Sequence, residues 1–225
     1  MDVVAVARAI DRVTLAVEPE HMNLDLTEHD PARAYFTLTQ TTIPRPVAWV
    51  LSENANGTHN LAPFSYFNAV CSDPPLIMIS VGKKSDGTFK DTRVNIEQRG
   101  DFVVHIVHLE MLEAMNQSSA TLPADTSEVE QLGLSLAEFP GSRLPRLADC
   151  RVAYDCECYQ IQKIGPGAQA LILGRVRHVY IDDAICSIDP KGRLKVHADR
   201  LNPIGRLGGG EYVTFGEIRE LVRPK

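Results

Sequence analysis

Two segments of the sequence concentrate side chains that could bind a small molecule. The first, Asn60–Val70, places hydroxyl, aromatic and amide groups together at the predicted end of a strand, just before the loop Cys71–Pro75. Taken alone, it is equally compatible with a structural role, in which the aromatic residues join the core and the polar residues form a turn. As a binding site, it would suit the edge of a planar heterocycle.

The second segment, Lys83–Asn95, is a basic, hydroxyl-rich loop that runs into a predicted helix. Free backbone N–H groups and the positive end of the helix dipole favour a phosphate at such a place. A solvated loop in which Asp91 caps the helix is the alternative, and for this segment by itself it is the simpler interpretation. Together, the two segments would hold both halves of a flavin mononucleotide (FMN), the heterocycle and its phosphate tail.

Motifs of other chemistries are missing from the sequence. It contains no phosphate loop, no Gly-x-Ser-x-Gly elbow, no His-Glu-x-x-His motif and no conspicuous carboxylate pair. Gly208–Gly210 follows no predicted strand and indicates a turn. Cys156 and Cys158 share one face of an alternating run, which favours a buried strand over a metal site without a second ligand pair. We also interpret His105 and His108 as structural, and we expect no metal.

Composition restricts the class of protein. The chain has 225 residues, 44% of them hydrophobic and 23% charged, with a net charge of −6, which argues against nucleic-acid binding. The longest apolar stretches, Leu76–Val81 and Phe102–Leu109, are far shorter than a membrane span. Five cysteines do not suggest a disulfide framework, and the N-terminus has no uninterrupted signal-peptide core. We therefore expect a cytoplasmic protein that does not bind membranes.

The predicted elements are mostly short strands. We predict strands at Val47–Leu51, Asn60–Phe64, Leu76–Val81, Phe102–Val107, Arg151–Ile161 and Ala170–Ile181. Helices are predicted at Thr92–Arg99, ended by Gly100, at Leu109–Gln117 and at Ser127–Leu132, with a loop at Pro140–Leu147. Few long helices and no βαβ rhythm indicate a mainly β protein built as an antiparallel barrel.

The N-terminal residues are expected to stand apart from this barrel. Residues 1–22 are predicted to be an extension with a weakly amphipathic helix from Val3 to Val13, and residues 23–225 are predicted to form one domain. A natural start at Met22 is the alternative, and the sequence leaves both open.

The sequence resembles the flavin reductase-like family, which includes flavoredoxins and the reductase components of two-component flavin monooxygenases. The matching stretches, in order and spacing, are Pro44–Val50, Ala62–Pro75, Leu76–Val81, Lys90–Thr92 and Asn95–Ile96. The likeness is strong over residues 24–109 and looser over Arg151–Ile181 and Leu201–Tyr212. It implies an antiparallel Greek-key split β-barrel with flanking α-helices, bound FMN, and a homodimer with FMN near the subunit interface.

The resemblance also implies which residues contact FMN. They are Arg45, Trp49, Ser65, Tyr66, Phe67, Asn68, Ser80, Lys90, Asp91, Thr92 and Asn95. The backbone of Ser65–Asn68 is expected along the isoalloxazine edge, and Lys90–Thr92 at the phosphate, with Asn95 one helical turn further on. Arg45 and Trp49 are expected as outer contacts. The Asp91 side chain is assigned to capping, because its carboxylate would repel a phosphate. Trp49, Tyr66 and Phe67 are further expected at the subunit interface.

Three functions follow from the resemblance. The first is an NAD(P)H:flavin oxidoreductase that could supply reduced flavin to a partner monooxygenase. The second is a flavoredoxin-like electron carrier with permanently bound FMN, and the third is a non-enzymatic binding protein. Because flavin itself carries the hydride, no catalytic side chain is expected. No residue distinguishes NADH from NADPH.

Overall fold

The computed structural model describes residues 22–167, 169–222 and 224. The chain divides into two compact units, Met1–Thr37 and Leu38–Lys225. The predicted helix from Val3 to Val13 lies outside the described residues, and the predicted domain start at residue 23 stays a prediction. The described part of the first unit contains the 3₁₀ turn η1 (Leu26–Glu28) and the beginning of helix α2 (Pro31–Thr41).

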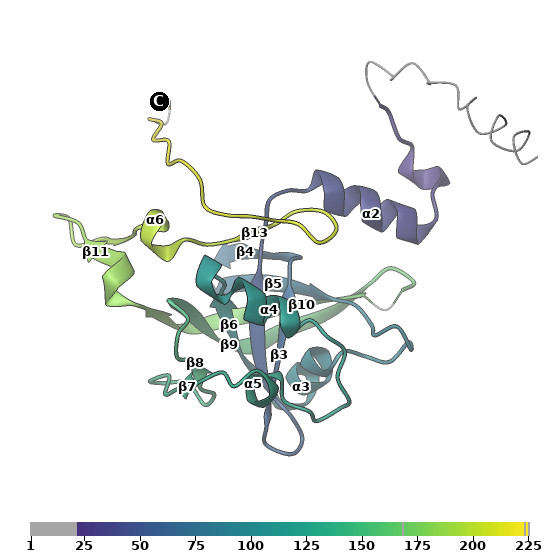
Figure 1. The fold of residues 1–225 in the computed structure, drawn as a ribbon, viewed down its shortest axis with the longest axis horizontal. Helices are drawn as coiled ribbons and strands as arrows, with labels where there is room; N and C mark the ends of the chain where they lie inside the picture. The colour runs from purple at the N-terminus through teal and green to yellow at the C-terminus, as the bar shows by residue number, and fades with distance from the viewer. Residues whose placement is uncertain (1–21, 168, 223, 225) are drawn as a thin grey trace, which may run out of the picture. The chain divides into compact units, whose positions relative to one another are not determined.

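The second unit is built on a seven-stranded antiparallel sheet with the strand order β3-β2-β6-β9-β10-β5-β4 (Figure 1). Its strands are β2 (Ala48–Glu53), β3 (His59–Phe64), β4 (Phe67–Ser72), β5 (Pro75–Val81), β6 (Asp101–Ile106), β9 (Val152–Ile164) and β10 (Gln169–Ile181). The predicted mainly β class with antiparallel pairing is therefore confirmed.

Three small sheets and several short helices surround the large sheet. In one small sheet, β13 (Gly205–Arg206) lies between β1 (Arg45–Pro46) and β14 (Tyr212–Val213). The other two pair β7 (Leu136–Ala137) with β8 (Arg146–Leu147) and β11 (Cys186–Ile188) with β12 (Leu194–Val196). The helices are α3 (Asp91–Arg99), η2 (Leu109–Met111), α4 (Leu112–Gln117), α5 (Glu128–Gln131), η3 (Asp183–Ile185) and α6 (Ala198–Leu201). No helix in the described part of the chain is long and apolar enough to cross a membrane.

The connections follow the turn signals of the sequence, with two exceptions. The β2–β3 hairpin turns at Gly57, with φ 83°, and Gly100, with φ 81°, ends α3 as predicted. However, the N-cap of α3 is Lys90, so the prediction that Asp91 caps this helix is wrong. Strand β4 was not predicted either. Its residues after Phe67 are all exposed, so the strand shows no apolar alternation.

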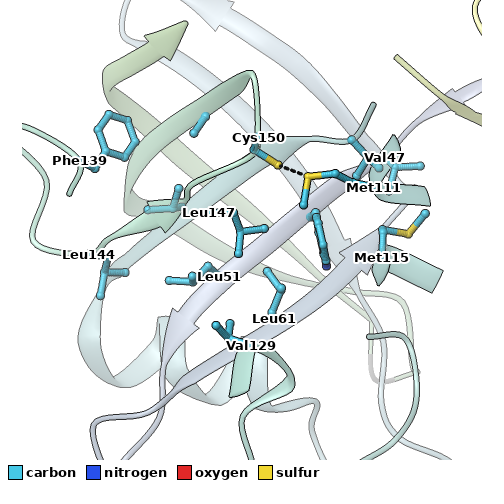
Figure 2. Packing of buried hydrophobic residues seen from close by; sticks show 14 of the residues in the cluster. Val47, Leu51, Leu61, Met111, Met115, Val129, Phe139, Leu144, Leu147 and Cys150 are labelled. Carbon is cyan, nitrogen blue, oxygen red and sulfur yellow. Dashed lines mark hydrogen bonds between the residues drawn. The ribbon is translucent and has the colours of Figure 1, made fainter. Parts of the chain in front are cut away.

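Both faces of β2 are buried. Trp49 and Leu51 point into one apolar cluster, whereas Ala48 and Val50 point into another, as the alternation along a strand requires. Figure 2 shows the first cluster, in which the thiol of Cys150 lies 3.4 Å from the Met111 sulfur. Trp49 has no exposed surface, so its predicted place at a subunit interface is wrong. This packing fixes β2 and its neighbour β3, which carries part of the candidate site.

Candidate functional site

A pocket opens where β3, the start of α3 and the loop after α4 come together. Its volume is about 470 Å3, including the solvent at its mouth. Its lining comprises Asn60, Ala62 and Pro63 of β3, Lys84, Lys90–Thr92, Ser118–Leu122 and Glu128. Three of the predicted phosphate-binding residues, Lys90, Asp91 and Thr92, are therefore brought together in one concave site.

Lys90 supplies a positive charge to this pocket. Its ammonium group lies 5.4 Å from the centre of the Phe64 ring, a cation–π contact. Partial burial lowers the pKa of Lys90, because desolvation disfavours the charged form. Among the described residues, no carboxylate forms an ion pair with it. A bound anion would form such an ion pair with Lys90.

The N-terminus of α3 adds backbone donors to the same place. No side chain caps this helix, so the N–H groups of Asp91 and Thr92 have no side-chain partner, whereas that of Arg93 donates to the Lys90 carbonyl at 2.9 Å. The helix dipole is positive here. The carboxylate of Asp91 forms an ion pair with Lys84, with an N–O distance of 2.8 Å. This partner explains why Asp91 can lie at an anion site, since Lys84 compensates its negative charge.

Thr92 is a buried polar residue of the pocket lining, as are Asn60, Ser118 and Glu128. Its Oγ1 accepts a hydrogen bond of 2.9 Å from the amide of Asn60, and the residue is only 1% exposed. The hydroxyl proton of Thr92 is not used in that bond. The side chain can therefore donate into the pocket while Asn60 fixes its position.

The loop at residues 118–122, which forms one wall of the pocket, was missed from the sequence. The indole N–H of Trp49 donates to Ser118 Oγ at 2.8 Å, and this hydroxyl donates to the Met115 carbonyl. Trp49 thus supports the wall from the core and is not itself among the pocket-lining residues. The run of small and hydroxylated residues Ser118–Thr121 after a predicted helix was the available signal.

Two predicted cofactor contacts have other partners. The amide of Asn95 donates to Ser52 Oγ at 3.1 Å and to Asn54 Oδ1 at 2.9 Å, which fastens α3 to β2. Asn95 is buried and does not line the pocket. Asn95 is joined to the pocket only indirectly, because Ser52 Oγ also accepts from Asn60, which bonds to Thr92.

The guanidinium group of Arg45 is hydrogen-bonded mainly to backbone carbonyl groups. It donates to the carbonyls of Thr39 and Thr42, each at 2.6 Å, and to that of Leu207 at 2.8 Å. A longer contact of 3.4 Å joins Nε to Ser65 Oγ. Arg45 lies beside the predicted ring site, but most of its donors are already used.

Of the residues predicted along the flavin ring, Ser65 and Tyr66 form the β3–β4 connection, and Phe67 and Asn68 begin β4. They follow the pocket-lining residue Pro63 closely in the chain. Ser80 donates its backbone N–H to the Tyr66 carbonyl at 2.9 Å, so it borders this connection, and its hydroxyl accepts from Gln169. Asn68 lies on the exposed part of β4, whereas Phe67 is only 8% exposed and joins the core. Phe67 is thus unsuited to the predicted subunit interface.

Comparison with known proteins identifies the family. The sequence pattern of the flavin reductase like domain matches residues 40–188, well over half of the chain. The chain belongs to this family. An uncharacterised protein of Halalkalibacterium halodurans is 40% identical over 195 residues, which cover 84% of this chain and 90% of that protein.

Solved structures agree with this assignment. The crystal structure of nitrilotriacetate monooxygenase component B from Bacillus cereus has a TM-score of 0.82 and 35% identity, covering 90% of this flavin reductase-like chain and all of the other. A protein with a split barrel domain from Shewanella frigidimarina has a TM-score of 0.77 at 18% identity, covering 91% of this chain and all of the other, which shows a common fold. The predicted split-barrel fold is thereby confirmed.

Proposed function

We propose that this chain binds FMN and acts as an NAD(P)H-dependent flavin oxidoreductase. The observation that carries the proposal is the pocket at the uncapped start of α3, where the ammonium of Lys90 has no ion-pair partner among the residues that the structure describes. Cationic and N–H donors converging in a concave site are the groups that a phosphate ester requires. The family membership supports flavin as the rest of the ligand.

In this proposal the two ends of FMN occupy adjoining places. The phosphate lies at Lys90, Thr92 and the start of α3, with the wall at residues 118–122 beside it. The isoalloxazine lies along the β3–β4 connection at Ser65 and Tyr66, near Ser80. The fit is favourable because the phosphate end offers a cation, a hydroxyl and the N–H groups of a helix start, whereas the ring end offers backbone groups and a partly exposed aromatic residue.

The chemistry belongs to the cofactor, and the protein supplies binding and orientation. Bound FMN accepts and donates a hydride, so the chain needs no catalytic side chain of its own. NAD(P)H is the proposed donor, and a flavin-dependent monooxygenase is a proposed recipient of the reduced flavin. The similarity to a monooxygenase component B supports the second point.

A flavin titration combined with an oxidation assay tests this function. Purified protein should be yellow, or should quench flavin fluorescence at micromolar FMN. It should also oxidise NADH or NADPH faster when free FMN is added. Binding of FMN without NAD(P)H oxidation would favour the electron carrier instead. A protein that binds no flavin at micromolar concentration would contradict both functions.

We further propose that the chain forms a homodimer and that strand β4 contributes to the interface. This strand lies at the edge of the large sheet, and its Val70 side chain is 52% exposed. An exposed edge strand with apolar side chains is a natural surface for association. Light scattering should give twice the mass of one chain. A monomer that still binds FMN tightly would contradict the placement of FMN near an interface.

A further inference from the structure

Glu128 places a carboxylate in the lining of the same pocket. It is the first residue of α5, and its Oε2 accepts a hydrogen bond of 2.8 Å from the Leu61 N–H of β3. The preceding Ser127 caps α5 and donates its hydroxyl to the His59 carbonyl. The side chain is therefore held in position by two connections between α5 and β3.

The charges of the pocket cancel. Lys84 and Asp91 neutralise each other in their ion pair, which leaves Lys90 and Glu128 as the remaining charged groups of the lining. Neither of these two has an ion-pair partner among the described residues. A phosphate that enters is thus attracted by Lys90 and repelled by Glu128, and partial burial strengthens both effects.

The surroundings of Glu128 already disfavour its charged form. Burial raises the pKa of this carboxyl and Asp91 adds to the shift, whereas the backbone N–H groups of Leu61 and Glu128 and the charge of Lys84 oppose it. A phosphate dianion would act in the same direction as Asp91. Part of the attraction of Lys90 for the phosphate is therefore offset by Glu128.

We infer that Glu128 is a specificity-determining residue that weakens the hold of this pocket on a terminal phosphate, so that FMN can exchange. The inference rests on the proposed function and refines it, because an exchangeable flavin serves as a diffusible substrate and not as a permanent cofactor. Glu128 acts by charge, whereas its hydrogen bond to Leu61 keeps it in place. An uncharged side chain of the same shape should therefore bind FMN more tightly.

The test compares Glu128→Gln with the wild type by measuring Kd for FMN and for riboflavin, which lacks the phosphate. Glutamine can still accept from the Leu61 N–H. At neutral pH and low salt, Glu128→Gln should bind FMN about tenfold more tightly and release it more slowly, with riboflavin unchanged. Glu130→Gln is the matched control, because Glu130 lies on the same helix but does not line the pocket.

Different outcomes separate this inference from the proposed function. Wild-type protein that binds neither flavin would overturn both. A second outcome would overturn only the role of Glu128. In it, the wild type binds FMN, but Glu128→Gln either does not raise the affinity for FMN or changes the affinity for both flavins equally. Glu128→Met removes the charge with a side chain of similar length and provides a second variant if Glu128→Gln does not fold. Riboflavin binding and a melting curve report folding in each case.

Discussion

Lys90 and Asn95 lie only five positions apart, yet the structure gives them different surroundings. Lys90 precedes the helix and reaches the pocket, whereas Asn95, one turn into α3, bonds to Ser52 and Asn54 of the β2–β3 hairpin. Both are polar residues in a basic segment, so their types do not distinguish them. What separates them is which neighbour each one contacts after folding.

Residue roles were predictable where local chemistry decides them. The basic loop before α3 and the turn glycines act within a few residues, and the sequence indicates these features directly. Trp49 depends instead on Ser118, 69 positions away, and Arg45 depends on Leu207, 162 positions away. Such distant partners cannot be inferred from sequence spacing. The sequence therefore predicts both residues near the flavin, whereas in the structure their polar groups bond to other parts of the chain.

The first prediction concerns Lys90. FMN and riboflavin differ only in the phosphate, so a residue that contacts the phosphate affects the affinity for FMN alone. Lys90→Ala should lower the affinity for FMN about tenfold to a hundredfold, because a hydrogen bond to a charged group contributes about 1.5–3 kcal/mol. Riboflavin affinity and the melting temperature without ligand should not change. Fluorescence titration with both flavins measures the effect.

Lys83→Ala is the matched control for Lys90→Ala. Lys83 belongs to the same loop, but its ammonium lies over the Phe89 ring and the residue does not line the pocket. Its substitution should leave both flavin affinities unchanged. An equal loss of FMN and riboflavin in Lys90→Ala would show that Lys90 supports the ring or the fold and not the phosphate. Thr92→Val is a less clean test, because it also removes the bond to Asn60.

At the scale of elements, the sequence predicted most strands of the large sheet and missed the smallest pieces. Strands buried on both faces, such as β2 and β6, appear as apolar runs, and paired hairpins carry turn residues between them. Two-residue strands such as β1 and β13 have no pattern of their own. They exist because a long-range contact holds them, and Arg45 provides such a contact.

Arg45 should therefore matter most for the small sheet β1–β13–β14. Arg45→Lys keeps the charge but replaces a planar group that donates to three carbonyls, so the free energy of unfolding should fall by about 1.5–3 kcal/mol. Hydrogen exchange should accelerate in Leu207–Glu211 before it does in the large sheet. Peptide-resolved exchange mass spectrometry and thermal melting measure the two effects.

A surface arginine provides the comparison for this variant. Arg175 on β10 forms a partly exposed ion pair with Glu157, so Arg175→Lys should change stability little. If exchange in Arg45→Lys rose equally in β2 and in Leu207–Glu211, Arg45 would support the whole unit, and the local role would be wrong.

On the scale of the whole molecule, His105 connects the buried strand β2 to the short strand β8. Its Nδ1 lies 3.1 Å from the Trp49 carbonyl, and its Nε2 accepts from the Leu147 N–H at 2.9 Å. The ring is therefore neutral, with its proton on Nδ1. This agrees with the structural role expected from the sequence, although spacing alone could not identify the two partners.

Acidification should destabilise the fold through this histidine. Burial lowers the pKa of His105 from 6.5 to about 4, partly opposed by the hydrogen bond to Trp49. Between these two values the unfolded chain binds more protons than the folded one, so stability falls as the pH drops from about 6.5 to about 4. Above pH 6.5 the contribution of the neutral His105 to stability is fully present. This pKa shift corresponds to a loss of about 3 kcal/mol in the free energy of unfolding across the range.

The decisive measurement is the free energy of unfolding in urea at several pH values between 7 and 4. His105→Gln can preserve both hydrogen bonds without titrating, so its stability should depend less on pH in this window than that of the wild type. His197→Gln, which replaces a partly exposed histidine next to β12, should keep the wild-type slope. The difference in slope between a variant and the wild type cancels the contribution of the carboxylates to the pH dependence. That includes Glu128, whose raised pKa makes stability change with pH in the opposite direction. Identical slopes for His105→Gln and the wild type would show that burial of this ring is not what makes the fold sensitive to acid.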